Sequence, residues 1–171
     1  MKFFITLVRL LGVSIVLLGT PIAFSGENPE LYQVKVKSRE VANRIVESRI
    51  RGHLVLVDQP KKFGADDLAP TPPEYLAVAY SSCVLSTLRL VAMIDKLDIN
   101  NIEVQVEGDI DFSKALGNAT TNRAGFSGLK VKISFESSLS KNEQQLFIQK
   151  AMSRGAVLDN VLNKTPVSYE W

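Results

Sequence analysis

The chain has 171 residues, 46% of them hydrophobic and 22% charged, so it is long enough for one domain with a substantial core and short for two. Its formal charge of +2 comes from 20 basic and 18 acidic residues. Two of the bases, Lys2 and Arg9, lie in residues 1–25, which contain no acid, so the remainder balances 18 bases against 18 acids. This neutrality, without a basic stripe interleaved with aromatic residues, argues against nucleic acid as a partner.

Residues 1–25 have the pattern of a signal peptide. After the two bases comes the apolar run Leu10–Leu18, and Ala23–Ser25 is a small-residue cleavage site, so residues 26–171 would be the mature domain. A membrane span needs about 20 apolar residues, so cleavage is the expectation. If Arg9 is tolerated inside the segment, Phe3–Leu18 would instead stay as an anchor. Either outcome predicts export, to the periplasm or outside the cell.

Alternating side chains predict strands in the first third of the mature domain. Tyr32–Lys37 is expected to form a half-buried strand, and Val41–Val57 two strands or one bent strand, with Gly52 at a bulge or a close approach. Within the second stretch, Ile50, Leu54 and Leu56 are expected on one face and Arg49, Arg51 and His53 on the other.

A long apolar helix is predicted from Pro72 to about Lys96. Thr71 can cap it, proline suits its first position, and Glu74 falls where it completes a capping box. The apolar residues leave little of its circumference for water, which is typical of a helix in a core or a subunit interface. Its two apolar stripes are Leu76, Tyr80, Cys83, Thr87 and Ala77, Val84, Leu88, Val91.

The second half of the chain predicts two further strands and two further helices. Alternation marks strands around Ile102–Val106, with an extension past a kink at Gly108–Phe112, and Leu129–Phe135. Between them Leu116–Gly125 is expected to be an exposed loop. The remaining elements are a helix opened by Ser140 and Glu143 and running to about Arg154, a short helix over Ala156–Leu162 and a closing strand over Thr165–Trp171. The order predicts an α+β fold in which an antiparallel sheet packs around a buried central helix.

Three blocks of this sequence resemble one known family. They are GADDLAPTPPEYLAVAYSSCVLSTLRLVA, IEVQVEGDID and GFSGLKVKISFESSLSKNEQQLFIQKAMSRGAVLDNVLNKTPV, in this order. Their order and spacing are similar to those of the osmotically induced protein C and organic hydroperoxide resistance (OsmC/Ohr) family, over residues 32–171. The resemblance implies an intertwined homodimer with both central helices buried together and an active site at the subunit interface.

The resemblance also implies peroxidase chemistry. In the family, a thiolate of the central helix attacks a hydroperoxide and a second, resolving cysteine forms a disulfide with the resulting sulfenic acid, which dithiols or lipoyl groups then reduce. Cys83 matches the first position. Gly155, in the block Arg154–Asn160, stands at the second, and the chain has no other cysteine. The partners implied are therefore a small hydroperoxide and an external thiol or dithiol reductant.

Two further catalytic candidates follow from the family. In the Ohr branch a glutamate near the start of the central segment and an arginine from an early strand activate the thiolate. Counting back from Cys83 places the glutamate at Pro73, so Glu74 is one residue away and is equally a capping residue. No segment matches the arginine motif, although Arg51 lies on a predicted strand before the helix. An exposed arginine without a role is the simpler reading of Arg51.

The reactivity of Cys83 is left open by the sequence. Burial among apolar residues would raise its pKa, and only a nearby cation, with Arg51, Arg89 or His53 as candidates, would reverse this. A helix break at Ser81–Ser82 would place the thiol at a new N-terminus and favour its ionisation. One histidine, one cysteine and no clustered acids give no support to a metal site or another cofactor.

Two functions from different classes follow. The first is an exported, one-cysteine, peroxiredoxin-like enzyme of oxidative stress defence that reduces organic hydroperoxides. The second is a protein of the same fold that binds a small apolar ligand at the dimer interface, with the absent side chain at Gly155 opening space beside Cys83.

Overall fold

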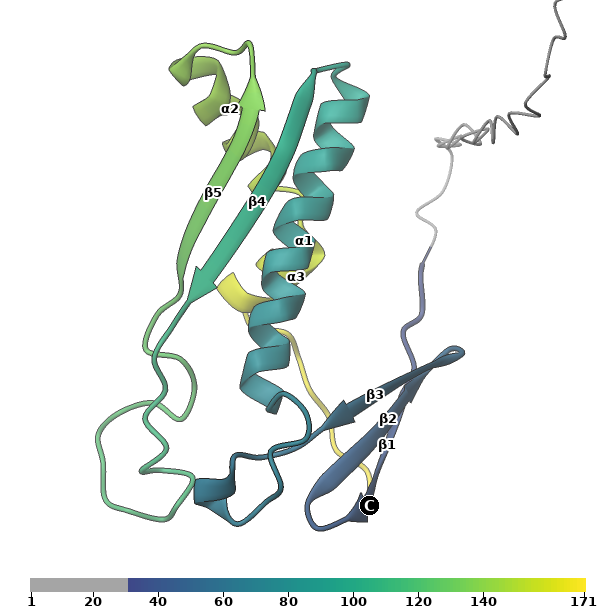
Figure 1. The fold of residues 1–171 in the computed structure, drawn as a ribbon, viewed down its shortest axis with the longest axis vertical. Coiled ribbons are helices and arrows are strands. Elements are labelled where there is room, and N and C mark those ends of the chain that lie inside the picture. The colour runs from purple at the N-terminus through teal and green to yellow at the C-terminus, as the bar shows by residue number, and fades with distance from the viewer. Residues whose placement is uncertain (1–30) are drawn as a thin grey trace, which may run out of the picture. The chain divides into compact units, whose positions relative to one another are not determined.

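The computed structural model describes residues 31–171, so the predicted signal peptide lies outside the described residues. The chain divides into residues 1–34 and 35–171, and the second unit contains every helix and strand described below (Figure 1). The elements in chain order are β1 (Val36–Ala42), β2 (Ile45–Ile50), β3 (His53–Val57), η1 (Lys61–Phe63), α1 (Pro72–Ile94), β4 (Ile99–Glu107), β5 (Lys130–Ser137), α2 (Lys141–Met152) and α3 (Ala156–Leu162).

Strands β1, β2 and β3 form an antiparallel sheet in that order. The predicted strands are confirmed in number, but β1 is exposed along its whole length from Val36 to Ala42, so the half-buried strand predicted over Tyr32–Lys37 was wrong in its bounds and its burial. The prediction of a bulge or close approach at Gly52 was also wrong, since Arg51 and Gly52 form the turn between β2 and β3 and a Cβ atom on Gly52 would meet nothing within 4 Å. Arg51 adopts a left-handed conformation there, with φ 53°. A bulge is therefore not needed, because the turn itself takes up both residues.

The predicted faces of this hairpin were also wrong. Residues paired across an antiparallel ladder project to the same side of the sheet. Ile50 pairs with His53, and Arg49 pairs with Leu54, so each predicted face mixes residues of both sides. The error arose because simple alternation along the chain does not hold across a two-residue turn.

Strands β4 and β5 form a separate antiparallel pair, with Val104 opposite Ile133 and a register shift between Asn100 and Glu103. Their half-buried residues alternate with exposed charged and polar residues, as predicted. Beyond Glu107 the ladder opens, and a single bridge joins Ile110 to Phe126 in place of the predicted strand extension.

The core lies where α1 meets β4, α2 and α3, and Figure 1 shows α1 and β4 side by side. One predicted stripe of α1 supplies Val84, Leu88 and Val91, all with no exposed surface. Burying a side chain of this size contributes about 1.5–3 kcal/mol. Around these three pack Ala92, Ile99, Phe147, Ala151 and Leu158.

The opposite face of α1 carries apolar side chains that its own unit leaves exposed. Val78 is 55% exposed and Met93 57%, and Leu85 lies on the same face. By length and composition alone α1 would suffice to cross a membrane, a test that core helices of soluble proteins also pass. The predicted burial of the central helix thus holds for one face within a single chain.

The predicted closing strand over Thr165–Trp171 was wrong. This segment is extended and exposed but belongs to no sheet, and Thr165 Oγ1 bonds to Asn160 Oδ1 at 2.5 Å. A strand requires a ladder partner, and within residues 31–171 none pairs with the segment.

Candidate functional site

Cys83 lies in the middle of α1 and is half-buried. It packs against the core cluster together with Tyr80, one turn earlier on the helix. Its sulfur lies 4.0 Å from the hydroxyl of Thr87, which donates a hydrogen bond to the Cys83 carbonyl oxygen at 2.7 Å. The thiol therefore sits at the boundary between the core and the surface of the unit.

The helix is continuous through Cys83, as predicted, and the alternative of a break at Ser81–Ser82 does not occur. Ser81 and Ser82 donate their hydroxyl hydrogen bonds back to the carbonyl oxygens of Val78 and Ala79, at 3.1 and 3.2 Å. These hydrogen bonds give both serine hydroxyls a partner inside the helix without ending it. Cys83 consequently gains nothing from a helix N-terminus, whose influence is confined to the first turn.

Glu74 completes the predicted capping box. Its carboxylate accepts from the Thr71 backbone N–H at 2.6 Å and from the Thr71 hydroxyl at 2.8 Å. The Thr71 backbone N–H, followed by its hydroxyl, lowers the pKa of Glu74 below its usual range. Nine residues of helix separate Glu74 from Cys83, about 13 Å along the axis. Within one chain the carboxylate is thus bound to the helix start and distant from the thiol.

The three candidate cations lie in different places. Arg51 is exposed in the turn between β2 and β3. The opposite end of β3 is the one that contacts α1, since the Tyr75 hydroxyl donates to the Leu56 carbonyl oxygen there, so Arg51 lies at the end of β3 away from α1. His53 is exposed beside this turn. The Arg89 guanidinium donates to the carbonyl oxygen of Ile99 at 2.6 Å. None of the three forms a hydrogen bond with Cys83 among the described residues.

Gly155 does not open space beside Cys83, so this expectation was wrong. A Cβ atom built on Gly155 would lie 2.9 Å from Cδ1 of Leu158 and 3.2 Å from its Cδ2. Leu158 is 2% exposed and belongs to the core cluster against which Cys83 packs. The leucine side chain fills the space next to the glycine.

An apolar groove of about 660 Å³ lies near the N-terminal half of α1. Leu76 and Tyr80 of α1 line it, together with residues of α3 and of the segment between β4 and β5. These two belong to the helix stripe that continues to Cys83 and Thr87, although Cys83 itself does not line the groove. Tyr80 therefore lines the groove and precedes the thiol by one turn of the helix. The other lining residues include Arg123, Phe126, Leu129, Val157, Asn160 and Val161.

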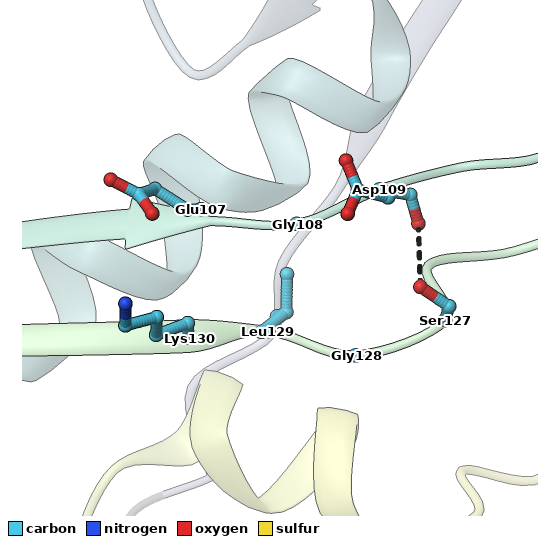
Figure 2. Close-up of a pocket in the computed structure, with 7 residues that line it drawn as sticks. All are labelled: Glu107, Gly108, Asp109, Ser127, Gly128, Leu129 and Lys130. Carbon is cyan, nitrogen blue, oxygen red and sulfur yellow. Dashed lines mark hydrogen bonds between the residues drawn. The ribbon is translucent and has the colours of Figure 1, made fainter.

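Gly108 allows one wall of this groove to form. A Cβ atom on Gly108 would lie 2.7 Å from the Gly128 carbonyl oxygen and from Leu129 Cδ2, and 2.8 Å from Phe126 Cδ1. Figure 2 shows this crossing within a neighbouring, more polar pocket, where Leu129 extends toward Gly108 and the Ser127 hydroxyl donates to the Asp109 carbonyl oxygen. Glycine is required here because the two segments approach too closely for a side chain.

Asp111 holds the loop that carries Arg123. Its carboxylate accepts from the Ser113 backbone N–H and the Asn122 side-chain amide, at 2.8 and 2.7 Å. Hydrogen bonds from the Ser113 and Asn122 side chains are the main causes that lower the pKa of Asp111 to about 2. The sequence pattern predicted an exposed loop over Leu116–Gly125 but did not indicate that the loop contributes to a site. The glycines that flank Phe126, at 125 and 128, were the available signal of a constrained segment.

Residues 31–171 contain no group of three or more His, Cys, Asp or Glu side chains able to hold a metal ion. The chemically distinctive features of the described chain are therefore a half-buried thiol and an adjacent apolar groove with one arginine.

Comparison with known proteins places these features in a family. The family model described as OsmC-like protein matches residues 64–170, which include α1 and Cys83. A search of curated proteins finds no match.

Solved structures share the fold at low sequence identity. An OsmC-like protein from Mycoplasma pneumoniae is 17% identical with a TM-score of 0.67, covering 78% of this chain and 89% of its own. An organic hydroperoxide resistance protein OsmC from Legionella pneumophila is 22% identical with a TM-score of 0.56, covering 77% and 90%. One from Elizabethkingia anophelis is 21% identical with a TM-score of 0.58, covering 80% and 93%.

Proposed function

The chain belongs to the OsmC family, and from this premise we propose that Cys83 is a peroxide-reducing thiol that works with an external reductant. The observation that carries the proposal is the position of Cys83: it is half-buried at the edge of the core, on the helix stripe that leads from the apolar groove. Structural neighbours named organic hydroperoxide resistance proteins support an organic hydroperoxide as the substrate.

The first step is a two-electron oxidation of sulfur. The Cys83 thiolate attacks the terminal oxygen of ROOH, the O–O bond breaks, and the products are a sulfenic acid on Cys83 and an alkoxide that takes a proton to become ROH. An external thiol R′SH then attacks the sulfenic sulfur, forming a mixed disulfide and releasing water. A second thiol reduces this disulfide and restores Cys83. The chain has no second cysteine to form an internal disulfide, so an external thiol must resolve the sulfenic acid as well as reduce the mixed disulfide.

A second copy of the chain is part of this proposal. The exposed apolar face of α1, with Val78 and Met93 more than half exposed, is suited to the equivalent face of another subunit. Leu54, 52% exposed on the β3 strand, adds to the apolar area that such an intertwined homodimer would cover. Arg51 and Glu74 are proposed to act in catalysis only in that assembly, since one chain keeps both apart from Cys83.

Export completes the proposal. Residues 1–25 would direct the protein to the periplasm or outside the cell, or anchor it to the membrane if the leader is not cleaved. Peroxides reach such a location directly, and the absence of a second cysteine prevents an internal disulfide from forming there.

Mass spectrometry of Cys83 tests the thiol chemistry. The full chain is treated with cumene hydroperoxide and a sulfenic acid trap, and peroxide consumption is followed with dithiothreitol present. We expect one trap adduct on Cys83, formed by reaction of the trap with its sulfenic acid, and turnover with the dithiol, both absent from Cys83→Ser. A thiol that stays unmodified while the peroxide persists would reject this function.

The groove favours a second candidate function, the binding of a small apolar ligand without chemistry at sulfur. Its volume of about 660 Å³ falls in the range of small-molecule sites, about 300–1,000 Å³. A Cys83→Ala protein should then bind an apolar probe such as decanol as well as the unchanged chain does. Loss of binding on this substitution would count against the second function.

A further inference from the structure

The walls of the apolar groove come from three parts of the chain that meet only in the fold. Leu76 lies on α1, Phe126 and Leu129 lie between β4 and β5, and Val157 and Val161 lie on α3. Their side chains provide an apolar surface for the body of a ligand. Removing the apolar surface of the ligand from water favours binding.

The groove also carries a positive charge and no negative one. Arg123 is the one charged residue among those that line it, and no acid is among them. Within residues 31–171, the ion pairs of the structure do not include Arg123. Its guanidinium lies beside Gly125, where an added Cβ atom would be 3.4 Å from Nη2. The guanidinium thus forms no ion pair in the described chain, although Asp109 and Asp111 line a neighbouring pocket together with it.

Asn160 adds a neutral donor to the same groove. Its side-chain oxygen accepts the hydroxyl hydrogen bond of Thr165, so its NH₂ group remains to donate. Arg123 and Asn160 together offer N–H donors, and neither side chain carries a negative charge. This set matches a carboxylate, whose two oxygens accept hydrogen bonds and whose charge pairs with a guanidinium.

We infer that the apolar groove binds a small amphipathic carboxylate, with its apolar body between α1 and α3 and its carboxylate at Arg123. The inference rests on the second function proposed above and adds the charge of the ligand. It does not involve Cys83, which does not line the groove. A neutral ligand of the same shape would leave Arg123 without a counter-ion, and a cationic one would meet the same charge.

Calorimetric titration of the full chain with decanoate, decanol and decylammonium, all below their micelle concentrations, tests the inference. We expect decanoate to bind at least about tenfold more tightly than decanol, because only its carboxylate can accept charge-assisted hydrogen bonds from Arg123. Decylammonium should bind more weakly than either. Added salt should reduce the preference for decanoate, because Arg123 is exposed and its charge is screened.

Substitutions test whether the preference for decanoate over decanol comes from Arg123. Arg123→Gln should remove the preference for decanoate and leave the affinity for decanol unchanged. Arg154→Gln, which removes the same charge from an exposed position outside the groove, should preserve the preference. Leu76→Ala should weaken both ligands. Circular dichroism spectra confirm that each variant is folded.

The outcomes separate this inference from the function on which it rests. Equal binding of decanoate and decanol, or a preference that survives Arg123→Gln, would overturn the carboxylate site and leave apolar ligand binding standing. The absence of binding by all three ligands would overturn both.

Discussion

A Cβ atom on Gly155 would lie 2.9 Å from Cδ1 of Leu158, so the leucine occupies the space next to the position where the family's second cysteine is expected. The backbone of Gly155, with φ −85° and ψ 117°, is accessible to any L-residue. The obstacle to a side chain at this position is therefore packing and not backbone conformation. The buried side chain of Leu158 already fills the space next to Gly155.

This relationship predicts the cost of restoring the cysteine. Gly155→Cys should destabilise the protein by about 1–3 kcal/mol, because the new side chain must displace the buried Leu158. In a Leu158→Ala background the same substitution should cost at least about 1 kcal/mol less, since the two side chains compete for one space. Urea unfolding of the four proteins gives this coupling energy. Equal costs in both backgrounds would show that the two positions do not share space.

The capping box of α1 predicts a loss of stability when its hydroxyl is removed. Thr71 accepts from the Glu74 N–H at 3.4 Å and donates to the Glu74 carboxylate at 2.8 Å. Thr71→Ala should destabilise the protein by about 1 kcal/mol and lower the melting temperature by about 2–4 °C. Thr71→Ser, which keeps the hydroxyl, is the matched control and should stay within about 0.5 kcal/mol of the unchanged chain. A Thr71→Ala protein with the same melting temperature as Thr71→Ser would show that the cap is dispensable.

The loop held by Asp111 should loosen in acid. Its folded-state pKa of about 2 lies below the usual 3.8, so its contribution to stability is fully present above the usual pKa and is lost as the pH falls toward 2. Hydrogen exchange at the Ser113 and Asn122 amides, whose residues bond to this carboxylate, should therefore accelerate several-fold relative to core amides between about pH 4 and pH 2, after correction for intrinsic rates.

Two substitutions serve as a matched pair for this measurement. Asp111→Asn should show the faster exchange already at pH 6 and little further change in acid. Asp109→Asn should retain the behaviour of the unchanged chain, because the Asp109 carboxylate accepts no hydrogen bond from another described residue. Identical exchange in all three proteins across this pH range would contradict the role of Asp111.

Much of the fold could be predicted because its signals are local. The capping boxes of α1 and α2 both form with the predicted residues, Thr71 with Glu74 and Ser140 with Glu143. Alternation located β4 and β5, and one apolar stripe of α1 became the core. Each of these features depends on residues close in sequence, so spacing alone specifies them.

The errors occurred where the outcome depends on chain reversal or on a partner. Alternation through Arg51 and Gly52 assigned the wrong faces because a two-residue turn pairs Ile50 with His53. The segment Thr165–Trp171 has strand-like alternation without a partner strand in the described chain. The apolar groove was not foreseen, since its walls are three segments distant in sequence. Contacts of this kind follow from tertiary packing, which a single sequence does not encode in its local pattern.

The position of Tyr80 predicts that the size of a thiol reagent affects its access to Cys83. It lines the apolar groove and packs on the core beside the thiol, and side chains of a helix lean toward its N-terminus, so Cys83 leans toward the turn of Tyr80. Tyr80→Ala should raise the alkylation rate of Cys83 by a bulky pyrenyl maleimide several-fold more than its rate with iodoacetamide. Tyr80→Phe keeps the ring and should leave the ratio of the two rates unchanged. Stopped-flow fluorescence and mass spectrometry measure these rates, and a ratio that Tyr80→Ala does not alter would show that access to the thiol does not pass this side chain.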